Sequence, residues 1–255
     1  MADPRSSVTL PAGLPSPPGY GGYQGFGLSY DRIHGRWFPV PSQWALPDGS
    51  RYVYPGQQGI YVVNPADNTF SQLGEGKAWI ILALDPQGVY AAVQNTAGLW
   101  LLPFSGAARQ ITAAGYWQAV GGGAAYGTTT SAVPPGAANQ IIRLDLKTAA
   151  NVTWFMADGG QSQVVGFDRS GSPLIQVTSS RGGQSYLWLA PSVGGATLIA
   201  IMGAGFPGSF NPYWPPIADQ QGVWFGGAST ISLFIPNTGL YAPVQIGGQL
   251  AGDCG

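Results

Sequence analysis

Residues 83–104 read ALDPQGVYAAVQNTAGLWLLPF, and this stretch decides the fold class of the chain. An apolar run leads up to Asp85, Gly88 follows three residues later, and a second apolar run begins directly after it. An aspartate that opens a tight turn can accept hydrogen bonds from nearby backbone, and glycine supplies the positive φ that such a turn needs. The stretch therefore predicts a β-hairpin, and the apolar GLWLLPF at 98–104 predicts a third strand.

The hairpin pattern recurs at further places along the chain. One copy has a shorter turn, and another keeps the glycines but lacks the aspartate. The copies are LPDGSRYVY (46–54), AVGGGAAYGTT (119–129), GFDRSGSPLIQV (166–177) and IADQQGVWFGG (217–227). We expect each copy to form the two inner strands of one repeating unit.

A short apolar segment also recurs once in each unit, and its β-branched and aromatic residues predict a strand. Its copies are GIYVVNP (59–65), GLWLLPF (98–104), QIIRLDL (140–146), SYLWLAP (185–191) and TISLFIP (230–236), and their starts are 39, 42, 45 and 45 residues apart. Each unit is thus expected to contain four strands. Four strands in about 40 to 45 residues is the spacing of a β-propeller blade.

The two ends of the repeating region complement each other. GFGLSYD (25–31) and RWFPV (36–40) resemble the outer half of a blade, and QLAGDCG (249–255) resembles an inner strand that reaches its aspartate turn. A blade shared by both ends would close the ring and leave no open sheet edge. We therefore predict an all-β propeller of six four-stranded blades over 25–255, with five blades as the alternative. Residues 1–24, rich in Pro and Gly, are expected to form a lead-in.

The composition excludes several classes of protein. The 9 Trp, 12 Tyr and 10 Phe give the chain the apolar mass that a disordered protein lacks. Only 8% of residues are charged, which argues against long solvated helices, and the net charge of −1 removes the electrostatic basis for binding nucleic acid or anionic membranes. No apolar run reaches the length of about 18 residues that crosses a bilayer, so we expect no membrane insertion.

The location of the protein is predicted from composition alone. The opening MADPRSSVTL lacks the apolar core and cleavage site of a signal peptide, and we expect a start trimmed from a longer chain. The single cysteine, Cys254, excludes an intrachain disulfide, so cysteine pairing gives no compartment. The charge-poor, Gly-rich and aromatic-rich composition favours an extracellular or cell-surface protein.

The repeat motifs resemble those of known propeller families. LPDGSRYVY is similar to the Ser-Pro-Asp-Gly hairpin of TolB-type repeats, and IADQQGVWFGG and ALDPQGVYAAV are similar to the hairpins of NHL-like and virginiamycin B lyase-like propellers. Over residues 25–255 the chain resembles bacterial extracytoplasmic propeller proteins of no settled activity. These motifs specify blade geometry and carry no function by themselves.

The residues that enzymatic propellers require are scarce. The resemblance to virginiamycin B lyases implies a histidine base, a metal and acidic partners, whereas this chain has one histidine, His34, at an expected outer turn. A propeller glycosidase needs two or three carboxylates near each other, and Glu75 is the single glutamate. The four repeated aspartates lie at equivalent turns, which spread around a ring, so we predict no metal site and no cofactor. They are Asp48, Asp85, Asp168 and Asp219.

Aromatic residues form the most informative pattern. A Trp tends to appear where a Gly-rich link enters an innermost strand, and such positions would converge on one mouth of the central channel. The competing interpretation is that these indoles pack between blades, as expected for Trp37, Trp100, Trp154, Trp188 and Trp224, which lie inside strand patterns. The candidate ligand-binding residues are Trp44, Trp79, Trp117 and Trp214, with Tyr116, Tyr213, Phe206 and Phe210 beside them.

We expect a non-catalytic binding or scaffold module. Aromatic rings beside uncharged amide groups suit a neutral glycan or a small apolar ligand, because sugar C–H faces stack on the rings and no charge has to be desolvated. A structural or protein-interaction domain is the alternative, with other protein chains as partners. A lyase-type or hydrolase-type enzyme ranks third.

Overall fold

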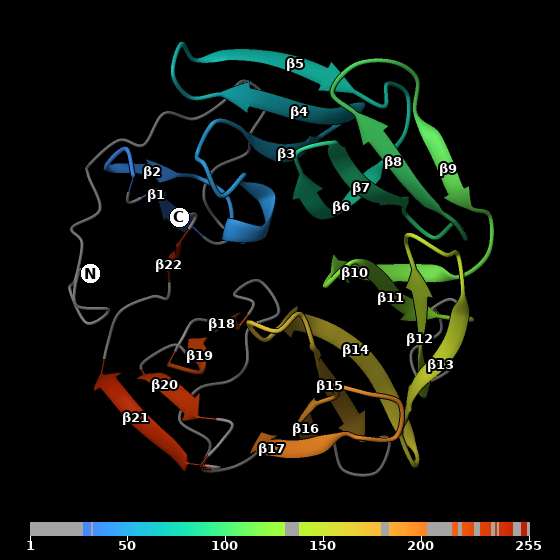
Figure 1. Ribbon diagram of the computed structural model, residues 1–255, viewed down its shortest axis with the longest axis vertical. Coiled ribbons are helices and arrows are strands. Elements are labelled where there is room, and N and C mark those ends of the chain that lie inside the picture. The colour runs from blue at the N-terminus through green and yellow to red at the C-terminus, as the bar shows by residue number, and fades with distance from the viewer. Residues whose placement is uncertain are drawn as a thin grey trace.

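The computed structural model describes residues 28–31, 33–130, 138–179, 184–202, 216–218, 221–226, 230–235, 238, 240–246 and 251–253. Strands within these ranges form six sheets, which Figure 1 shows as a ring around a common centre. This arrangement is a β-propeller, as the repeat predicts. The number of blades, six with five as the alternative, stays a prediction. Among the described residues, no helix is long and apolar enough to span a membrane.

Four of the sheets have the predicted four strands in chain order, with antiparallel neighbours. Of the strands that begin these sheets, β10 contacts both β6 and β14, and the last strand of each sheet lies at the outside of the ring (Figure 1). The strands are β6 (Trp79–Asp85), β7 (Gly88–Val93), β8 (Leu99–Pro103) and β9 (Arg109–Thr112); β10 (Tyr116–Gly121), β11 (Ala124–Thr128), β12 (Gln140–Asp145) and β13 (Asn151–Met156); β14 (Gly160–Phe167), β15 (Pro173–Ser179), β16 (Ser185–Leu189) and β17 (Thr197–Met202); and β18 (Ile217–Ala218), β19 (Val223–Gly226), β20 (Thr230–Ile235) and β21 (Leu240–Ile246).

The repeated aspartates act through turn chemistry, as predicted. Asp85 Oδ1 accepts hydrogen bonds from the backbone N–H groups of Gln87 at 2.7 Å and Gly88 at 3.2 Å. Gly88 has a φ of 151°, and a side chain there would collide with the carbonyl of Leu102 on the neighbouring strand. Glycine is therefore required where the turn passes back beside the sheet.

Each regular sheet also contains β-bulges at recurring positions. In the innermost strands, Leu82 and Val165 are the extra residues at equivalent register shifts. In the outermost strands the extra residues are Ile111, Trp154 and Ile199. A bulge turns neighbouring side chains toward the same face of a sheet, so these positions control what lies between adjacent sheets.

The β3–β5 sheet departs from the prediction of four strands. It contains β3 (Tyr52–Gly56), β4 (Gly59–Asn64) and β5 (Thr69–Leu73), and the expected innermost strand is replaced by the short 3-10 helix η1 (Ser42–Trp44). Only Ala45 bridges to Tyr52. Pro41 and Pro47 flank this segment. Because proline has no N–H for a strand ladder, these residues explain why the inner strand is lost.

Both ends of the chain contribute to one sheet, as the complementary ends predict. This closing sheet has the order β2 (Arg36–Phe38), β1 (Leu28–Asp31), β22 (Ala251–Asp253). Leu28 lies opposite Ala251, and the β1–β22 pair is parallel, unlike the antiparallel hairpin pairs. A parallel pair cannot be made by a tight turn, and here the rest of the ring is the connection between the two strands.

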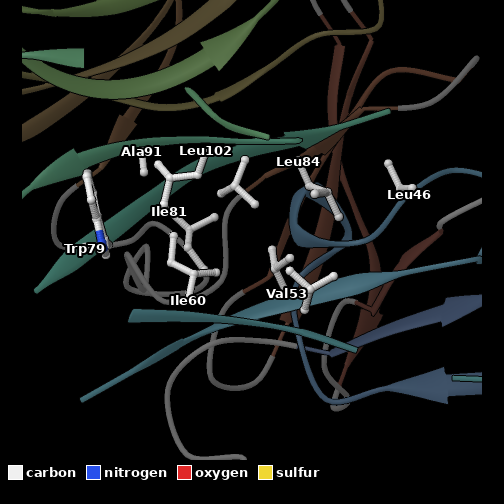
Figure 2. Packing of buried hydrophobic residues seen from close by; sticks show 10 residues of the cluster. Leu46, Val53, Ile60, Trp79, Ile81, Leu84, Ala91 and Leu102 are labelled. Carbon is white, nitrogen blue, oxygen red and sulfur yellow. The ribbon is translucent and has the colours of Figure 1, made fainter. Parts of the chain in front are cut away.

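Apolar clusters fill the spaces between neighbouring sheets. Figure 2 shows one of them, in which Val53 and Ile60 of the β3–β5 sheet pack against Ile81, Ala91 and Leu102 of the β6–β9 sheet. Similar clusters join the β6–β9 sheet to the β10–β13 sheet, and that sheet to β14–β17. Each fully buried aliphatic side chain contributes about 1.5 to 3 kcal/mol, so these clusters dominate the stability of the ring.

Candidate ligand-binding groove

Two of the predicted ligand-binding tryptophans pack between sheets. Trp79 is 6% exposed and lies at one end of the cluster in Figure 2, and Trp117 is 5% exposed in the next cluster. The Trp79 Nε1–H donates to the carbonyl of Gly74, and the Trp117 Nε1–H donates to the carbonyl of Ala114 at 2.9 Å. For these two indoles the interpretation of packing between blades holds, because a carbonyl of the preceding link accepts the hydrogen bond from each N–H.

The expectation that these tryptophans hold matching repeat positions is wrong. Trp117 lies directly before the bulge of its strand, opposite Gly127, and the residue in that position of β6 is Ile81. Trp79 therefore lies two positions earlier in its strand than Trp117 does. Trp44 is half-buried in η1, and Tyr116 is half-buried at the start of β10. The other four predicted residues, Trp214, Tyr213, Phe206 and Phe210, lie outside the described residues.

A cavity of about 600 Å³ lies at the outer part of the ring, between β13 and the β14–β17 sheet. We call it the aromatic groove. One wall is β13 with the link that follows it, and the other wall comes from β15, β16 and the loop between β16 and β17. It is lined by Thr153, Trp154, Phe155, Met156, Ala157, Asp158, Gly159, Val177, Ser179, Tyr186, Trp188, Val193, Gly194 and Ala196.

A β-bulge places two aromatic residues of β13 beside the next sheet. Trp154 is the extra residue of this bulge, and the equivalent outer-strand positions elsewhere hold Ile111 and Ile199. The Trp154 Nε1–H donates to the carbonyl of Ala190 at 2.8 Å, which anchors the indole to the neighbouring sheet. Phe155 follows directly and is 9% exposed.

The opposite wall presents two rings of β16. Trp188 pairs with Ile175 in the sheet, and its ring centroid lies 6.0 Å from that of Phe155. Tyr186 lies two residues earlier on the same face, and its hydroxyl donates to Oε1 of Gln184 at 2.8 Å. Four half-buried or buried rings from two sheets thus meet in one groove, held by contacts that exist without a ligand.

Sequence reasoning missed this groove because it assigned Trp154 and Trp188 to the packed core. Both side chains do pack against the cluster between the two sheets, but both are only half-buried and both line the cavity. One signal was available for Trp154. At the bulge position where the other regular sheets carry Ile111, Ile199 and Val244, this sheet carries a tryptophan, which is a larger side chain.

The groove contains few charges. Asp158 is its one ionisable carboxylate, lies on the exposed link after β13, and forms no ion pair with any described residue. Thr153 and Ser179 add hydroxyl groups. Over the described ranges, no group of three or more His, Cys, Asp or Glu side chains is placed to hold a metal ion. The arrangement suits stacking with one polar contact at the rim.

The single histidine belongs to a polar cluster in the closing sheet. Asp31 is fully buried, and its Oδ2 lies 2.7 Å from Nδ1 of His34 and accepts from Nε of Arg36 at 3.1 Å. Arg36 also donates to the carbonyl of Gly49, which joins this sheet to the turn before β3. Burial raises the pKa of the Asp31 carboxyl, but the hydrogen bonds from His34 and Arg36 outweigh it and hold the pKa below its usual value.

Comparisons with known proteins establish the fold of the chain. No protein-family model matches it. No curated relative matches it. It is similar to the structure of a putative TolB from Agrobacterium tumefaciens, with 16% identity over 90% of this chain and 92% of that chain and a TM-score of 0.58.

Two further solved structures are similar at lower scores. A functionally unknown protein from Desulfotomaculum acetoxidans DSM 771 has 15% identity over 89% of this chain and 81% of that chain, with a TM-score of 0.47. Oligogalacturonate lyase from Vibrio parahaemolyticus has 10% identity over 87% and 78%, with a TM-score of 0.41. At such identities the likeness concerns the fold alone. The chain is an all-β protein with the β-propeller fold, similar in architecture to the putative TolB.

Proposed function

We propose that this propeller is a non-catalytic binding module and that its ligand site is the aromatic groove. The observation that carries the proposal is the cavity of about 600 Å³ into which Trp154, Phe155, Tyr186 and Trp188 converge from two sheets. Small-molecule sites in proteins are concave, largely apolar and of this size class, with few polar groups that fix orientation. The groove has each of these properties.

The ligand that suits these rings best is the face of a sugar in a glycan, or an apolar ring of similar size. Aromatic side chains bind the C–H faces of sugars without a desolvated charge, and each good ring contact contributes on the order of 1 kcal/mol. Asp158, Thr153 and Ser179 supply acceptors and hydroxyl groups at the rim. The low charge of the chain and its fold likeness to a putative TolB support action outside the cytoplasm, at the cell surface or beyond it.

Titration calorimetry and tryptophan fluorescence with neutral oligosaccharides test this proposal. We expect binding by the intact protein and a loss of about tenfold or more in Trp188→Phe, which changes the stacking surface while limiting the cavity that is left. Trp100→Phe is the matched control, because Trp100 holds the same register position in the β6–β9 sheet, away from the groove. Equal loss in both variants, or no binding by any sugar, would contradict the proposal.

A structural or protein-interaction role is the second candidate, and one observation favours it. Exposed apolar side chains border the groove on both sides: Val152 and Met156 on β13, and Val193 and Leu198 near β17 are 40% to 61% exposed. A second chain could cover them. Sedimentation of the protein at several concentrations, with and without Met156→Lys, tests this role, and a monomer in every sample would exclude self-association through this face.

A further inference from the structure

The β6–β9 and β14–β17 sheets share one register, which allows their residues to be compared position by position. Leu82 and Val165 are the equivalent bulge residues of the innermost strands. Each of these sheets has a tryptophan in its third strand, opposite a residue of the second strand. That second-strand residue pairs with the innermost-strand residue directly before the bulge. Trp100 and Trp188 are therefore equivalent. The link that precedes each innermost strand can be compared by counting back from the bulge.

Five residues before the bulge, one sheet has Lys77 and the other has Gly160. The Lys77 ammonium lies 4.3 Å from the ring centroid of Trp100 and 5.3 Å from that of Trp79. These are the distances of cation–π contacts, in which the negative face of an indole attracts a cation. In the β6–β9 sheet the chain itself thus supplies a cation to Trp100, the tryptophan that is equivalent to Trp188.

Among the residues that the structure describes, none supplies such a cation to a ring of the β14–β17 sheet. Gly160 has no side chain, and the equivalent tryptophan, Trp188, lines the aromatic groove. Seven residues before the bulge, Glu75 and Asp158 are equivalent, so both links carry a carboxylate at the same position. Asp158 also lines the groove. The groove therefore keeps the aromatic ring and the acid of the β6–β9 arrangement and lacks the amine.

We propose that the aromatic groove binds the ammonium group of a small ligand, in the place that the Lys77 amine takes in the β6–β9 sheet. This inference rests on the proposed function of the groove and specifies its ligand class: a compound with a protonated or quaternary amine, a chemistry that amino sugars and choline-type compounds share. Rings from two sheets around a site with one unpaired carboxylate are the arrangement that recognises such cations.

The other charge near these rings does not oppose a bound cation. The Arg143 guanidinium lies 5.2 Å from the Trp154 ring centroid, and its Nη2 lies 3.3 Å from Oδ2 of Asp145, which balances its charge. Arg143 is not among the residues that line the groove. Among the described residues that line the cavity, Asp158 is the carboxylate.

Calorimetry with matched probes tests the inference on the intact chain. Choline and its neutral isostere 3,3-dimethyl-1-butanol differ by one charge, and glucosamine disaccharide and cellobiose differ chiefly by their amines. We expect choline to bind about tenfold or more tighter than its isostere, because a desolvated cation–π site contributes up to about 2 kcal/mol. Whichever amine binds tighter identifies the source of the ammonium group. Cellobiose binding with no preference for either amine would overturn the inference and leave the proposed function standing.

Asp158→Asn separates charge recognition from shape. We expect choline affinity to fall about three- to tenfold and the affinity for the isostere to stay unchanged, because the substitution removes charge and keeps size. Glu75→Gln is the matched control at the equivalent position and is expected to change neither affinity. If Asp158→Asn weakens both probes equally, or neither, the carboxylate does not select a cation and the inference is wrong.

Lys77→Ala provides a gain-of-function test. Lys77 lies on an exposed link, so the variant should fold, and it removes the amine that lies over the rings of Trp79 and Trp100. We expect the number of choline sites to rise from one to two. A stoichiometry that stays at one would remove the equivalence between the two sheets and overturn the inference. The reverse change, Gly160→Lys, is a poorer test, because a Cβ there would lie 2.8 Å from the carbonyl of Thr178.

Discussion

The β6–β9 sheet and the closing sheet are held to their neighbours by different means. Around β6–β9 the contacts are those of aliphatic and aromatic side chains, with Leu99 fully buried on one side and Leu102 nearly so on the other. The closing sheet also has an apolar face, with Phe38 and Val40, but it adds a fully buried carboxylate, Asp31. The regular sheet is assembled from local hairpins, whereas the closing sheet depends on strands from opposite ends of the chain.

This difference indicates how the ring divides its stability. A sheet made from consecutive hairpins needs only apolar side chains at alternating positions to pack against the next sheet. In the closing sheet the buried Asp31 carboxylate is bonded by His34 and Arg36, so it fixes the local β1–β2 hairpin, because misplaced pairing would leave the charge unsatisfied. The pairing of β1 with β22, which come from opposite ends of the chain, is separate from this cluster. The following experiments disturb each kind of sheet in turn.

Removal of residues 249–255 should have the largest effect. It deletes β22, leaves the edge of β1 without a partner and opens the ring. We expect aggregation or a fall in the melting temperature large enough to abolish a cooperative transition at the wild-type position. Calorimetry and light scattering check this outcome. A truncated protein that melts like the intact chain would show that the closing sheet does not hold the ring together.

Leu99→Ala should destabilise the regular part of the ring without opening it. Leu99 is fully buried between the β6–β9 and β10–β13 sheets. Truncation of a buried leucine leaves a cavity and costs about 2 to 5 kcal/mol. Denaturant unfolding should show this loss with an unchanged slope. An exposed leucine, Leu198, gives the control, since Leu198→Ala is expected to cost less than about 1 kcal/mol.

Asp31→Asn should weaken the closing sheet by an intermediate amount and change its response to acid. The substitution removes the charge that pairs with Arg36 and His34, and we expect a loss of about 2 to 3 kcal/mol near neutral pH. Because the pKa of Asp31 is lower in the folded protein, its contribution is present above the ordinary value of 3.8 and is lost as pH falls through the folded value.

The pH profile distinguishes this cause from general loss of packing. Between neutral pH and pH 3, wild type should lose more stability than Asp31→Asn does, so the two unfolding curves should converge in acid. Parallel curves would mean that the Asp31 charge contributes nothing specific. Glu75→Gln, on an exposed link, is a suitable control.

Tyr54→Phe is expected to change the free energy of unfolding least at neutral pH. Its effect on stability is expected in alkaline solution. Burial, with a smaller contribution from the adjacent Tyr61, raises the pKa of Tyr54 to about 12. The stabilising contribution of a raised pKa is complete below the unfolded value of 10.0 and is lost as pH rises toward 12. Wild type should therefore lose about 2 to 3 kcal/mol over this range, and Tyr54→Phe should lose less. Identical alkaline profiles would contradict the assignment.

Much of the fold follows from local sequence chemistry. Asp85 and Gly88 predict their hairpin because the turn depends on hydrogen bonds and φ values within four residues. The lost inner strand of the β3–β5 sheet was predictable in principle from Pro41 and Pro47, but LPDGSRYVY resembles the other hairpins closely enough to suggest a complete unit. Here the prediction of the turn is confirmed, and the prediction of an innermost strand before it is wrong.

The candidate site could not be found in the same way. The aromatic groove is formed where Trp154, the extra residue of a bulge in β13, lies near Trp188 of the neighbouring sheet. Both facts depend on register between strands, which long-range pairing decides. The burial of Trp79 and Trp117 could not be predicted for a different reason. Their N–H partners are backbone carbonyls of Gly74 and Ala114, and every residue type has such a carbonyl, so the residue types in these links do not indicate the contact.

The parallel β1–β22 pair has a consequence for how the ring forms. Leu28 and Ala251 are neighbours in space but more than 200 residues apart in the chain, so their contact carries the largest loop-closure entropy among the described strand pairs. During synthesis β1 is made early, and its edge stays unpaired until β22 has been made, when nearly all of the described sheets have been translated. Throughout that interval the growing chain carries an unpaired strand edge, the feature through which folding intermediates aggregate. We therefore expect the nascent chain, before β22 pairs with β1, to aggregate more readily than the closed ring.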